Sequence, residues 1–351
     1  MTPAVPESGT TSEADRGEDR PHVRWGILGT GDIARQFASD LNEIEQAELI
    51  AIGSRARETA ERFGDTHKIP RRYSSYEELA ADPDIDLVYI GTPHPYHHDN
   101  TLLCLENGRG VVCEKPFALN ATEAREMIEF ARGKDLFLME AMWTYCFPAI
   151  REVTKKIQDG AIGEVRMVKA DFCFRIEFDP MFRLFNAALG GGALLDVGVY
   201  TVALVQLIFG RKPEAISAEA HLGETGVDEQ AGIVMKYPNG EMAVLTCASR
   251  TELPQEALIL GTEGWIRIPT FSQPDTFTIG NSKREETLRF ERIGYGYAFE
   301  ALEAMDAFNR GDKESNAIPL DSTLMLMETL DEIREIWGLR YPSEISTRKK
   351  S

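Results

Sequence analysis

Short apolar runs alternate with helix-forming stretches from Val23 to about Glu140. After the first run, Ile33, Phe37 and Leu41 recur at the three- and four-residue spacing of an amphipathic helix. The runs that predict buried strands are 23–28, 47–55, 85–92, 110–114 and 136–140, and the stretches that predict helices are 32–44, 58–63, 76–81, 99–106 and 122–133. Strands and helices that alternate at this spacing predict a parallel sheet with helices on both faces.

The pattern changes from about Met142 onward. Residues 147–159 and 324–337 predict helices, and apolar residues alternate with polar ones along 163–178. Further strand-like segments are 215–221, 231–237, 242–248, 256–260 and 264–268. Pro238-Asn239-Gly240 is typical of a hairpin turn, and strands joined by short turns without crossover helices predict an antiparallel sheet. We therefore expect a second, α+β domain with a large, mainly antiparallel open sheet.

These patterns divide the chain into two domains, at 22–142 and 143–340, with a tail at each end. Residues 1–21 are rich in Ser, Thr, Glu and Asp and lack a basic segment followed by an apolar one, which predicts a disordered tail rather than a secretion signal. Residues 341–351 end in Arg348-Lys349-Lys350 and predict a basic C-terminal tail.

Composition and charge restrict the possible partners. The 351 residues are 43% hydrophobic and 27% charged, as in a globular protein, and carry a net charge of −19. Phosphate backbones and anionic membrane surfaces would repel this charge, so we expect no nucleic acid and no membrane partner. No apolar run approaches the ~20 residues needed to span a bilayer.

Cysteine usage indicates a reducing compartment. The five cysteines are odd in number, scattered singly and without C-x-x-C spacing, which favours reduced thiols in a cytoplasmic protein over disulfides or a zinc site. They are Cys104, Cys113, Cys146, Cys173 and Cys247.

The turn after the first predicted strand carries the main binding motif. Gly29, Gly31 and Ala34 form the pattern G-x-G-x-x-A between a buried strand and a helix start. The first Gly permits the sharp turn, the second lets the backbone approach a pyrophosphate, and the small third residue lets the helix pack on the strand. We expect the pyrophosphate on the helix N-terminus, with Thr30, Asp32 and Ile33 beside it. The N-terminal domain is therefore predicted to be a Rossmann dinucleotide-binding domain.

The end of the second strand bears on the choice of cofactor. NAD-binding folds usually place an acidic residue there against the ribose 2′-hydroxyl, whereas this chain has Ser54 and Arg55. A guanidinium can bind a 2′-phosphate that a carboxylate would repel. We therefore expect NADP(H) to be preferred and NAD(H) to remain possible; the alternative is that Arg55 is a solvated loop charge.

Polar residues gather where the parallel strands end, which is where such sheets bind ligands. They are Thr92, His97, Lys115 and Glu140. His94, His97 and His98 do not predict a metal site, because they flank a Pro in a loop and no carboxylate or thiolate cluster accompanies them. A position lining the cofactor or substrate cleft is the interpretation we favour for His97.

Gly190-Gly191-Gly192 and the apolar run after it predict a turn that leads into a helix ending near Phe209. Asp196 and Tyr200 are four residues apart, so on an α-helix they would project from one face.

Several of these motifs occur together in one known family. The G-x-G-x-x-A turn, Thr92-Pro93 with His97, Glu114-Lys115-Pro116, and Gly190-Gly191-Gly192 with Asp196 and Tyr200 follow one another in this order. From Val23 to Trp337 the chain thus resembles the Gfo/Idh/MocA family of oxidoreductases. The resemblance implies an N-terminal dinucleotide domain, a C-terminal open sheet often used for dimerisation, and Lys115 beside the nicotinamide.

One departure from the family pattern concerns the substrate. Many members carry His where this chain has Tyr200. With Glu140-Ala141-Met142-Trp143 upstream, this Tyr resembles the dimeric dihydrodiol dehydrogenase and D-xylose dehydrogenase branch. The resemblance implies an aldose, a sugar-derived carbonyl or a trans-dihydrodiol rather than a cyclitol, with Trp143, Asp196 and Tyr200 near the substrate.

Hydride transfer at a carbinol carbon also requires a group that moves the hydroxyl proton. A buried Lys has a lowered pKa and can exchange protons near neutrality, and a Tyr hydroxyl beside an ammonium becomes more acidic. We assign Lys115 and Tyr200 as the proton-transfer pair, with Asp196 holding Lys115 in place; which of the two gives up the proton stays open. Lys115 is a charged residue that ends a buried strand, and such a position needs a reason. The alternatives are that Asp196 is a helix N-terminal charge and that Tyr200 is an ordinary core aromatic.

The complete sequence-based hypothesis is an NADP-dependent oxidoreductase acting on a small polyol, sugar or diol, associated as a homodimer or tetramer through the C-terminal sheet. The alternative is a non-catalytic NADP(H)-binding regulator or sensor of the same fold. The remaining residues expected to contact the cofactor are Pro93, His94 and Glu114.

Overall fold

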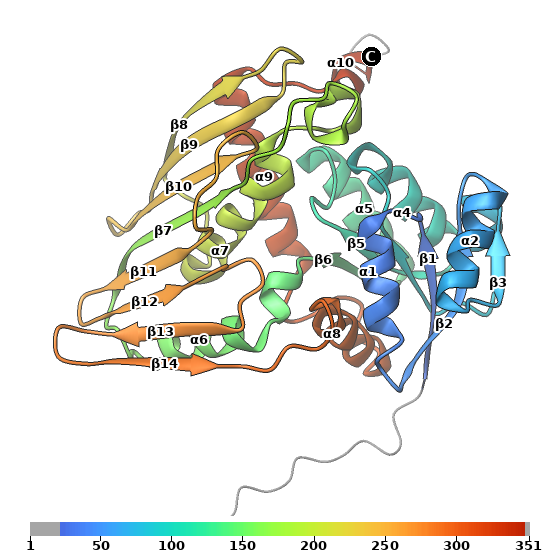
Figure 1. The fold of residues 1–351 in the computed structure, drawn as a ribbon, viewed down its shortest axis with the longest axis horizontal. Helices are drawn as coiled ribbons and strands as arrows, with labels where there is room; N and C mark the ends of the chain where they lie inside the picture. The colour runs from blue at the N-terminus through green and yellow to red at the C-terminus, as the bar shows by residue number, and fades with distance from the viewer. Residues whose placement is uncertain (1–21, 348–351) are drawn as a thin grey trace, which may run out of the picture.

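The computed structural model describes residues 22–347, which form two sheets joined by helices (Figure 1). The first sheet is parallel, with strand order β3-β2-β1-β4-β5-β6. Its strands are β1 (Val23–Leu28), β2 (Ala47–Gly53), β3 (Arg71–Tyr73), β4 (Leu87–Ile90), β5 (Gly110–Glu114) and β6 (Leu138–Ala141). Its helices are α1 (Asp32–Leu41), α2 (Arg57–His67), α3 (Tyr76–Ala80), α4 (His97–Glu106) and α5 (Ala121–Lys134). The strand order reverses between β1 and β4, the position where ligands bind to such sheets.

The second sheet has eight strands in the order β14-β13-β12-β11-β7-β10-β9-β8. Its strands are β7 (Val165–Cys173), β8 (Ala215–Leu222), β9 (Asp228–Lys236), β10 (Met242–Ala248), β11 (Ala257–Gly261), β12 (Trp265–Ile268), β13 (Thr276–Gly280) and β14 (Glu285–Arg289). Neighbouring strands are antiparallel except β7 and β10, which are parallel. The predicted fold class, Rossmann domain plus mainly antiparallel α+β domain, is confirmed.

Helices cover one face of the second sheet. The remaining helices are α6 (Pro148–Gln158), α7 (Val199–Phe209), α8 (Tyr297–Asn309), α9 (Leu320–Trp337) and α10 (Pro342–Thr347). In Figure 1, α7 and α9 lie on the side of the sheet that faces the first sheet. The strands alternate accordingly: along β9, residues that point toward the helices are buried and their neighbours are exposed.

Helices from the end of the chain fasten the two sheets together. Helix α8 packs against α1, and α9 packs against α5 and α7. The Asp40 carboxylate at the end of α1 accepts hydrogen bonds from the N–H groups of Tyr295 (2.8 Å), Gly296 (2.9 Å) and Ala298 (3.2 Å), where α8 begins. The first and last parts of the fold are therefore built against each other at the cleft between the domains.

Three strands and two helices escaped the sequence analysis: β3, β13, β14, α8 and α10. The strands β3 and β14 lie at sheet edges and are largely polar. Because their residues are half-buried or exposed throughout, the sequence there shows no alternation of apolar and polar positions. Helix α8 is rich in Ala and Glu and has a weak apolar stripe.

The predicted tails need one correction. The N-terminal tail 1–21 lies outside the described residues, as do Arg348, Lys349 and Lys350. Residues Pro342–Thr347, which we assigned to a basic tail, instead form α10. Tyr341 is fully buried and donates a hydrogen bond from its hydroxyl to the Gly191 carbonyl (2.7 Å), so this end of the chain packs against the glycine turn.

The expectation that no apolar segment approaches membrane-spanning length is wrong, because one segment has the length and the composition of a membrane-spanning helix. Among residues 22–347, the helical segment Ala187–Phe209 has a mean hydropathy of 1.8 over its most apolar part. Because 89% of that part is buried inside the protein, the segment has the character of a core helix.

Candidate active site

The glycine turn between β1 and α1 has the geometry that a dinucleotide requires. Gly29 has φ +109°, and a Cβ there would lie 2.8 Å from the Gly91 carbonyl oxygen, so a larger residue does not fit. A Cβ on Gly31 would meet nothing within 4 Å, which leaves the approach to the helix open. No side chain caps α1, so its first N–H groups are available to an anion. Ile33 is 38% exposed beside this turn.

Arg55 lies at the end of β2, where the 2′-phosphate was predicted. Its guanidinium is 5.7 Å from the centroid of the Tyr96 ring and is hydrogen-bonded to Tyr76, and it makes no ion pair with a carboxylate among residues 22–347. Ser54 is buried, and its hydroxyl is hydrogen-bonded to that of Thr59. No carboxylate of the described residues neutralises this cation, so its charge can attract an anionic ligand.

The loop after β4 is held by its histidines. His97 is fully buried, with Nε2 2.7 Å from the Thr92 carbonyl and Nδ1 2.9 Å from the Pro116 carbonyl. It therefore links two loops rather than lining the cleft, which corrects our expectation. His94 contacts the Gly190 carbonyl through Nδ1 (3.0 Å), and burial lowers its pKa to about 3, so the ring is neutral.

The other polar residues of this loop bond to their immediate surroundings. Thr92 accepts a hydrogen bond from the Asn100 amide (3.0 Å). His98 lies apart from the cleft, between Asp99 (2.8 Å) and Glu126 (3.0 Å). Within residues 22–347, no group of three or more His, Cys, Asp or Glu side chains could hold a metal ion.

Lys115 follows β5 and reaches the second domain, where its side chain contacts the segment that leads into α7. Its Nζ donates to the Asp196 carbonyl (2.7 Å) and lies 4.6 Å from the centroid of the Tyr200 ring. Burial lowers the pKa of Lys115, while the negative charges of Asp196 and Glu114 act in the opposite direction. The three residues assigned to proton transfer therefore lie together where the domains meet.

The contacts within this group differ from those we expected. The carbonyl of Asp196, not its carboxylate, holds Lys115, and the Asp196 carboxylate accepts from Arg183 (2.7 Å). Lys115 faces the Tyr200 ring rather than its hydroxyl. Burial, reinforced by Glu114, raises the pKa of Tyr200 well above its ordinary value, contrary to the acidifying effect of an ammonium that we expected.

The local fold explains how Asp196 and Tyr200 reach this place. Asp196 lies in η5 (Leu194–Gly198), one turn of π-helix that precedes α7, so the α-helical four-residue argument does not apply to the pair. The turn before η5 needs glycine at position 192, because φ there is +120° and a Cβ would lie 2.2 Å from the Asp228 carboxylate. That carboxylate accepts from the N–H of Leu194 (2.6 Å) and fixes the start of the helix.

Two buried carboxyl groups, Glu114 beside Lys115 and Glu300 near Glu114, lie close to the site. Glu114 accepts from the Tyr89 hydroxyl (2.5 Å) and from the Lys115 N–H (3.1 Å). Glu300 on α8 is fully buried and has no hydrogen-bond partner among the described residues. Burial and the charges of Glu114 and Asp40 raise the pKa of Glu300 well above its ordinary value, which favours its uncharged form.

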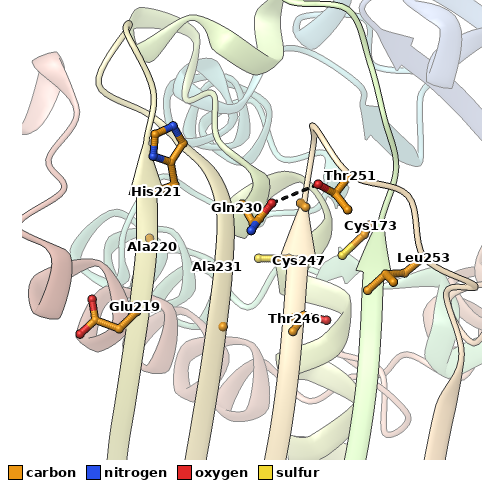
Figure 2. A pocket seen from close by; sticks show the side chains of 12 residues that line it. Cys173, Glu219, Ala220, His221, Gln230, Ala231, Thr246, Cys247, Thr251 and Leu253 are labelled. Atoms are coloured by element: carbon orange, nitrogen blue, oxygen red, sulfur yellow. Dashed lines mark hydrogen bonds between the residues drawn. The ribbon is translucent and has the colours of Figure 1, made fainter.

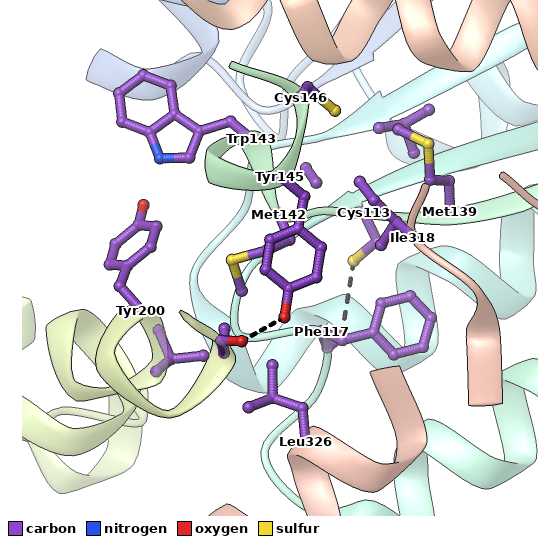
Figure 3. Close-up of a cluster of buried hydrophobic side chains, with 14 of the residues drawn as sticks. Cys113, Phe117, Met139, Met142, Trp143, Tyr145, Cys146, Tyr200, Ile318 and Leu326 are labelled. Atoms are coloured by element: carbon purple, nitrogen blue, oxygen red, sulfur yellow. Dashed lines mark hydrogen bonds between the residues drawn. The ribbon is translucent and has the colours of Figure 1, made fainter. Parts of the chain in front are cut away.

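Aromatic rings form the walls beside Tyr200. Phe172 stacks on Tyr200, with ring centroids 5.5 Å apart, and Phe271 lies edge-on to Phe172 at 6.3 Å. Trp143 stacks on Tyr297 at 4.6 Å, and its indole Nε1 is buried without a partner among residues 22–347. In Figure 3 the Tyr200 hydroxyl points toward the side on which Trp143 lies. The site thus combines an apolar aromatic lining with unpaired polar groups.

The segment that carries Trp143 is fixed to the second domain by two hydrogen bonds. Thr144 donates to the Ser272 carbonyl (2.6 Å), and Tyr145 donates to the Ala203 carbonyl on α7 (2.7 Å; Figure 3). These two bonds connect η2 (Trp143–Cys146) to the second sheet and to the helix of Tyr200.

Family models and curated relatives agree with this architecture. The model described as "Oxidoreductase family, NAD-binding Rossmann fold" matches residues 23–142, and the GFO/IDH/MocA C-terminal domain matches residues 150–267. Trans-1,2-dihydrobenzene-1,2-diol dehydrogenase from Xenopus laevis is 39% identical over 331 residues, which are 91% of this chain and 99% of that protein. The Homo sapiens enzyme of the same name is 36% identical over 92% of this chain and 99% of its own length. The chain belongs to the Gfo/Idh/MocA family.

Solved structures of other proteins share the whole fold of this Gfo/Idh/MocA oxidoreductase. A 3-ketoreductase from Actinomadura kijaniata, in complex with NADP and TDP-benzene, has a TM-score of 0.81 at 25% identity, over 90% of this chain and 97% of that one. The aldose-aldose oxidoreductase from Caulobacter crescentus has a TM-score of 0.82 at 23% identity, with the same coverage. The predicted family and the predicted class of enzyme are confirmed.

Several residues of the site were not found from the sequence. Phe172 and Phe271 are aromatic residues at buried or half-buried positions of the second domain, and Tyr297 begins a helix that we did not predict. Arg183 lies in an irregular loop, where no periodicity marks a position. The only sequence signal for it is a basic residue shortly before the Gly190–Gly192 turn.

Proposed function

We propose that this oxidoreductase is an NADP(H)-dependent dehydrogenase acting on a sugar, a sugar derivative or a trans-dihydrodiol. When bound in the Gly29–Ile33 turn, the cofactor would exchange a hydride at nicotinamide C4 with the carbinol carbon of the substrate. Support for NADP(H) comes from Arg55 at the end of β2, which no carboxylate of the described residues neutralises, and from the NADP held by the Actinomadura ketoreductase. The aromatic walls formed by Trp143, Phe172 and Tyr297 favour a flat, partly apolar substrate ring.

The observation that carries the proposal is the position of Lys115 between the Asp196 carbonyl and the Tyr200 ring. In the oxidative direction the carbinol C–H leaves as hydride, and the hydroxyl proton passes to Lys115, either directly or through the Tyr200 hydroxyl. In the reductive direction the same pair returns a proton to the new alkoxide. A Lys whose pKa burial lowers suits both directions near neutral pH.

A substrate panel tests the proposal. Purified protein is supplied with NADP or NAD and with trans-dihydrodiols, D-xylose and other aldoses, and reduced cofactor is followed by its absorbance. We expect saturable turnover of at least one class with NADP. Tight NADPH binding without turnover of any compound would support the alternative, a non-catalytic regulator or sensor.

We further propose that the protein is a homodimer or tetramer that associates through the outer face of the second sheet. Apolar side chains interrupt the polar residues along this face, which the helices leave uncovered in Figure 1. They include Met167, Val234, Val244, Leu258, Leu260 and Trp265. A hollow of about 470 Å³ lies at one end of the same face, with the Thr251 hydroxyl hydrogen-bonded to Gln230 (3.1 Å; Figure 2).

We also propose a cytoplasmic location. All five cysteines lie within the described residues, and all are buried and unpaired. Free thiols persist in a reducing compartment. Measuring the location of a tagged chain by cell fractionation tests this.

A further inference from the structure

The carboxylate of Asp196 is hydrogen-bonded to a cation that the sequence analysis did not assign, and not to Lys115. Arg183 Nη1 lies 2.7 Å from Asp196 Oδ1, and the side chains are 47% and 8% exposed. Lys115 itself makes no ion pair with a carboxylate of residues 22–347; its ammonium is bonded to the Asp196 carbonyl. One residue, Asp196, thus binds two cations through two different groups.

This arrangement has a chemical consequence for Lys115. A carboxylate in direct contact with a buried ammonium strongly favours the charged form, and such a lysine would not readily release a proton. Pairing with Arg183 occupies the Asp196 carboxylate, and the guanidinium adds a positive charge near Lys115. Both effects favour neutral lysine.

We propose that Arg183 is a positioning residue for proton transfer: by holding the Asp196 carboxylate, it keeps Lys115 free to gain and lose a proton. The inference rests on the proposed function, because it assumes that Lys115 moves a proton during turnover. Arg183 acts through Asp196, and its contact with substrate is not required.

The other charged and titratable groups around Lys115 do not replace Arg183. Glu114 on its own strand and Glu140 on β6 are negative influences, and Asp196 is the third. His94 and His97 are kept neutral because burial lowers their pKa values. Tyr200 stays protonated because burial raises its pKa. Arg183 is therefore the positive group that offsets the three carboxyl groups around Lys115.

The test is the pH dependence of kcat for Arg183→Gln. Loss of the guanidinium frees the Asp196 carboxylate for Lys115, so the pKa of Lys115 should rise by about 1 pH unit or more. In the oxidative direction the acid limb of the profile then moves to higher pH, so kcat falls about tenfold at pH 7 and recovers under more alkaline conditions. In the reductive direction the alkaline limb moves the same way. A purely structural defect would lower kcat at every pH.

Two further variants fix the sign. Asp196→Asn removes the anion and leaves both cations, so the same limb should move to lower pH. Arg183→Lys keeps the charge with fewer donors and should restore most of the parental profile. If Arg183→Gln fails to fold in a thermal melt, these two variants carry the test. Arg151→Gln is the control. Arg151 is 50% exposed and bonded to Glu303 at 2.7 Å, the same distance as Arg183 to Asp196. This variant should leave the acid limb of the kcat profile where it lies in the parent.

A second measurement does not depend on turnover. Lysines are dimethylated with ¹³C-formaldehyde, and the Lys115 signal, identified by its absence in Lys115→Met, is titrated by NMR in the parent and in Arg183→Gln. We expect a higher pKa in the variant. An unchanged pKa, with an unchanged pH profile, would overturn the inference while leaving Lys115 as the proton carrier. Full activity of Lys115→Met would instead refute the proposed mechanism.

Discussion

At the scale of single residues, the cofactor preference depends on one cation at the end of β2. A charged hydrogen bond from Arg55 to a 2′-phosphate contributes ~1.5–3 kcal/mol, so Arg55→Ala should weaken NADPH binding roughly 10- to 150-fold. NADH lacks the phosphate, so its binding should change little. Fluorescence titration of both cofactors into the variant measures this, and equal losses for the two would refute the assignment.

The proton-transfer pair is the second prediction at this scale. General acid–base assistance contributes ~10²–10⁴-fold in rate, so Lys115→Met and Tyr200→Phe should each lower kcat by about that factor. NADPH affinity should change much less, because both side chains lie at the reacting end of the site. The double variant should lose far less than the product of the two factors, since residues that act as one unit fail together. Turnover of Lys115→Met within a few-fold of the parent would show that another group moves the proton.

At the scale of elements, the contact between β6 and α9 contains a buried acid. Glu140 at the end of β6 accepts from the Thr323 hydroxyl on α9 (2.9 Å), and its second oxygen has no partner among residues 22–347. Burial raises the pKa of Glu140 from 4.5 to about 7. The contact between strand and helix therefore depends on whether this acid is charged.

The sign of the pH effect follows from this raised value. Below pH 4.5 Glu140 is protonated in both the folded and the unfolded chain, so its burial does not make the free energy of unfolding depend on pH. Between pH 4.5 and about 7 Glu140 ionises in the unfolded chain but stays protonated in the folded one, so the free energy of unfolding falls as pH rises. The loss amounts to about 3 kcal/mol. Glu140→Gln should therefore melt near the parent temperature at pH 4.5 and above it at pH 8. Thermal melts across this range measure the difference, and the exposed Glu335→Gln serves as control; parallel curves for parent and Glu140→Gln would contradict the prediction.

Strong local patterns made most elements predictable. The buried strand β4 is a continuous apolar run, β1 and β5 are apolar except for Arg24 and Glu114, and the G-x-G-x-x-A turn fixes where α1 begins. The polar edge strands β3 and β14 are held extended by pairing with neighbouring strands, and this pairing leaves no pattern in their own residues. The site was predictable where a motif marks it, as at Lys115. Arg183 was not, because its pairing with Asp196 depends on the path of an irregular loop.

At the scale of the whole molecule, the two domains form one site only because the end of the chain returns to the beginning. Asp40 fixes the start of α8, and α8 brings Tyr297 and Glu300 to the cleft. Lys115 comes from the first domain, and Tyr200 comes from the second. Any change in the angle between the domains would thus move the aromatic residues relative to Lys115.

Association through the outer sheet face is the prediction at this scale. Leu258 on β11 lies on this face, directly opposite Lys169 on β7 and Arg267 on β12. A glutamate at position 258 can pair with these cations in a monomer but would bring an ionised group into a closely packed interface, which is costly. We expect Leu258→Glu to fold normally and to shift the protein from dimer or tetramer to monomer at micromolar concentration in light scattering.

A matched substitution separates this effect from general solubility. Ile336 on α9 is 46% exposed and lies away from the sheet face, so Ile336→Glu adds the same charge without touching the proposed interface. Its oligomeric state should equal that of the parent. If the parent is itself a monomer at micromolar concentration, or if both variants dissociate alike, the outer face is not the interface, and its apolar residues must be explained in another way.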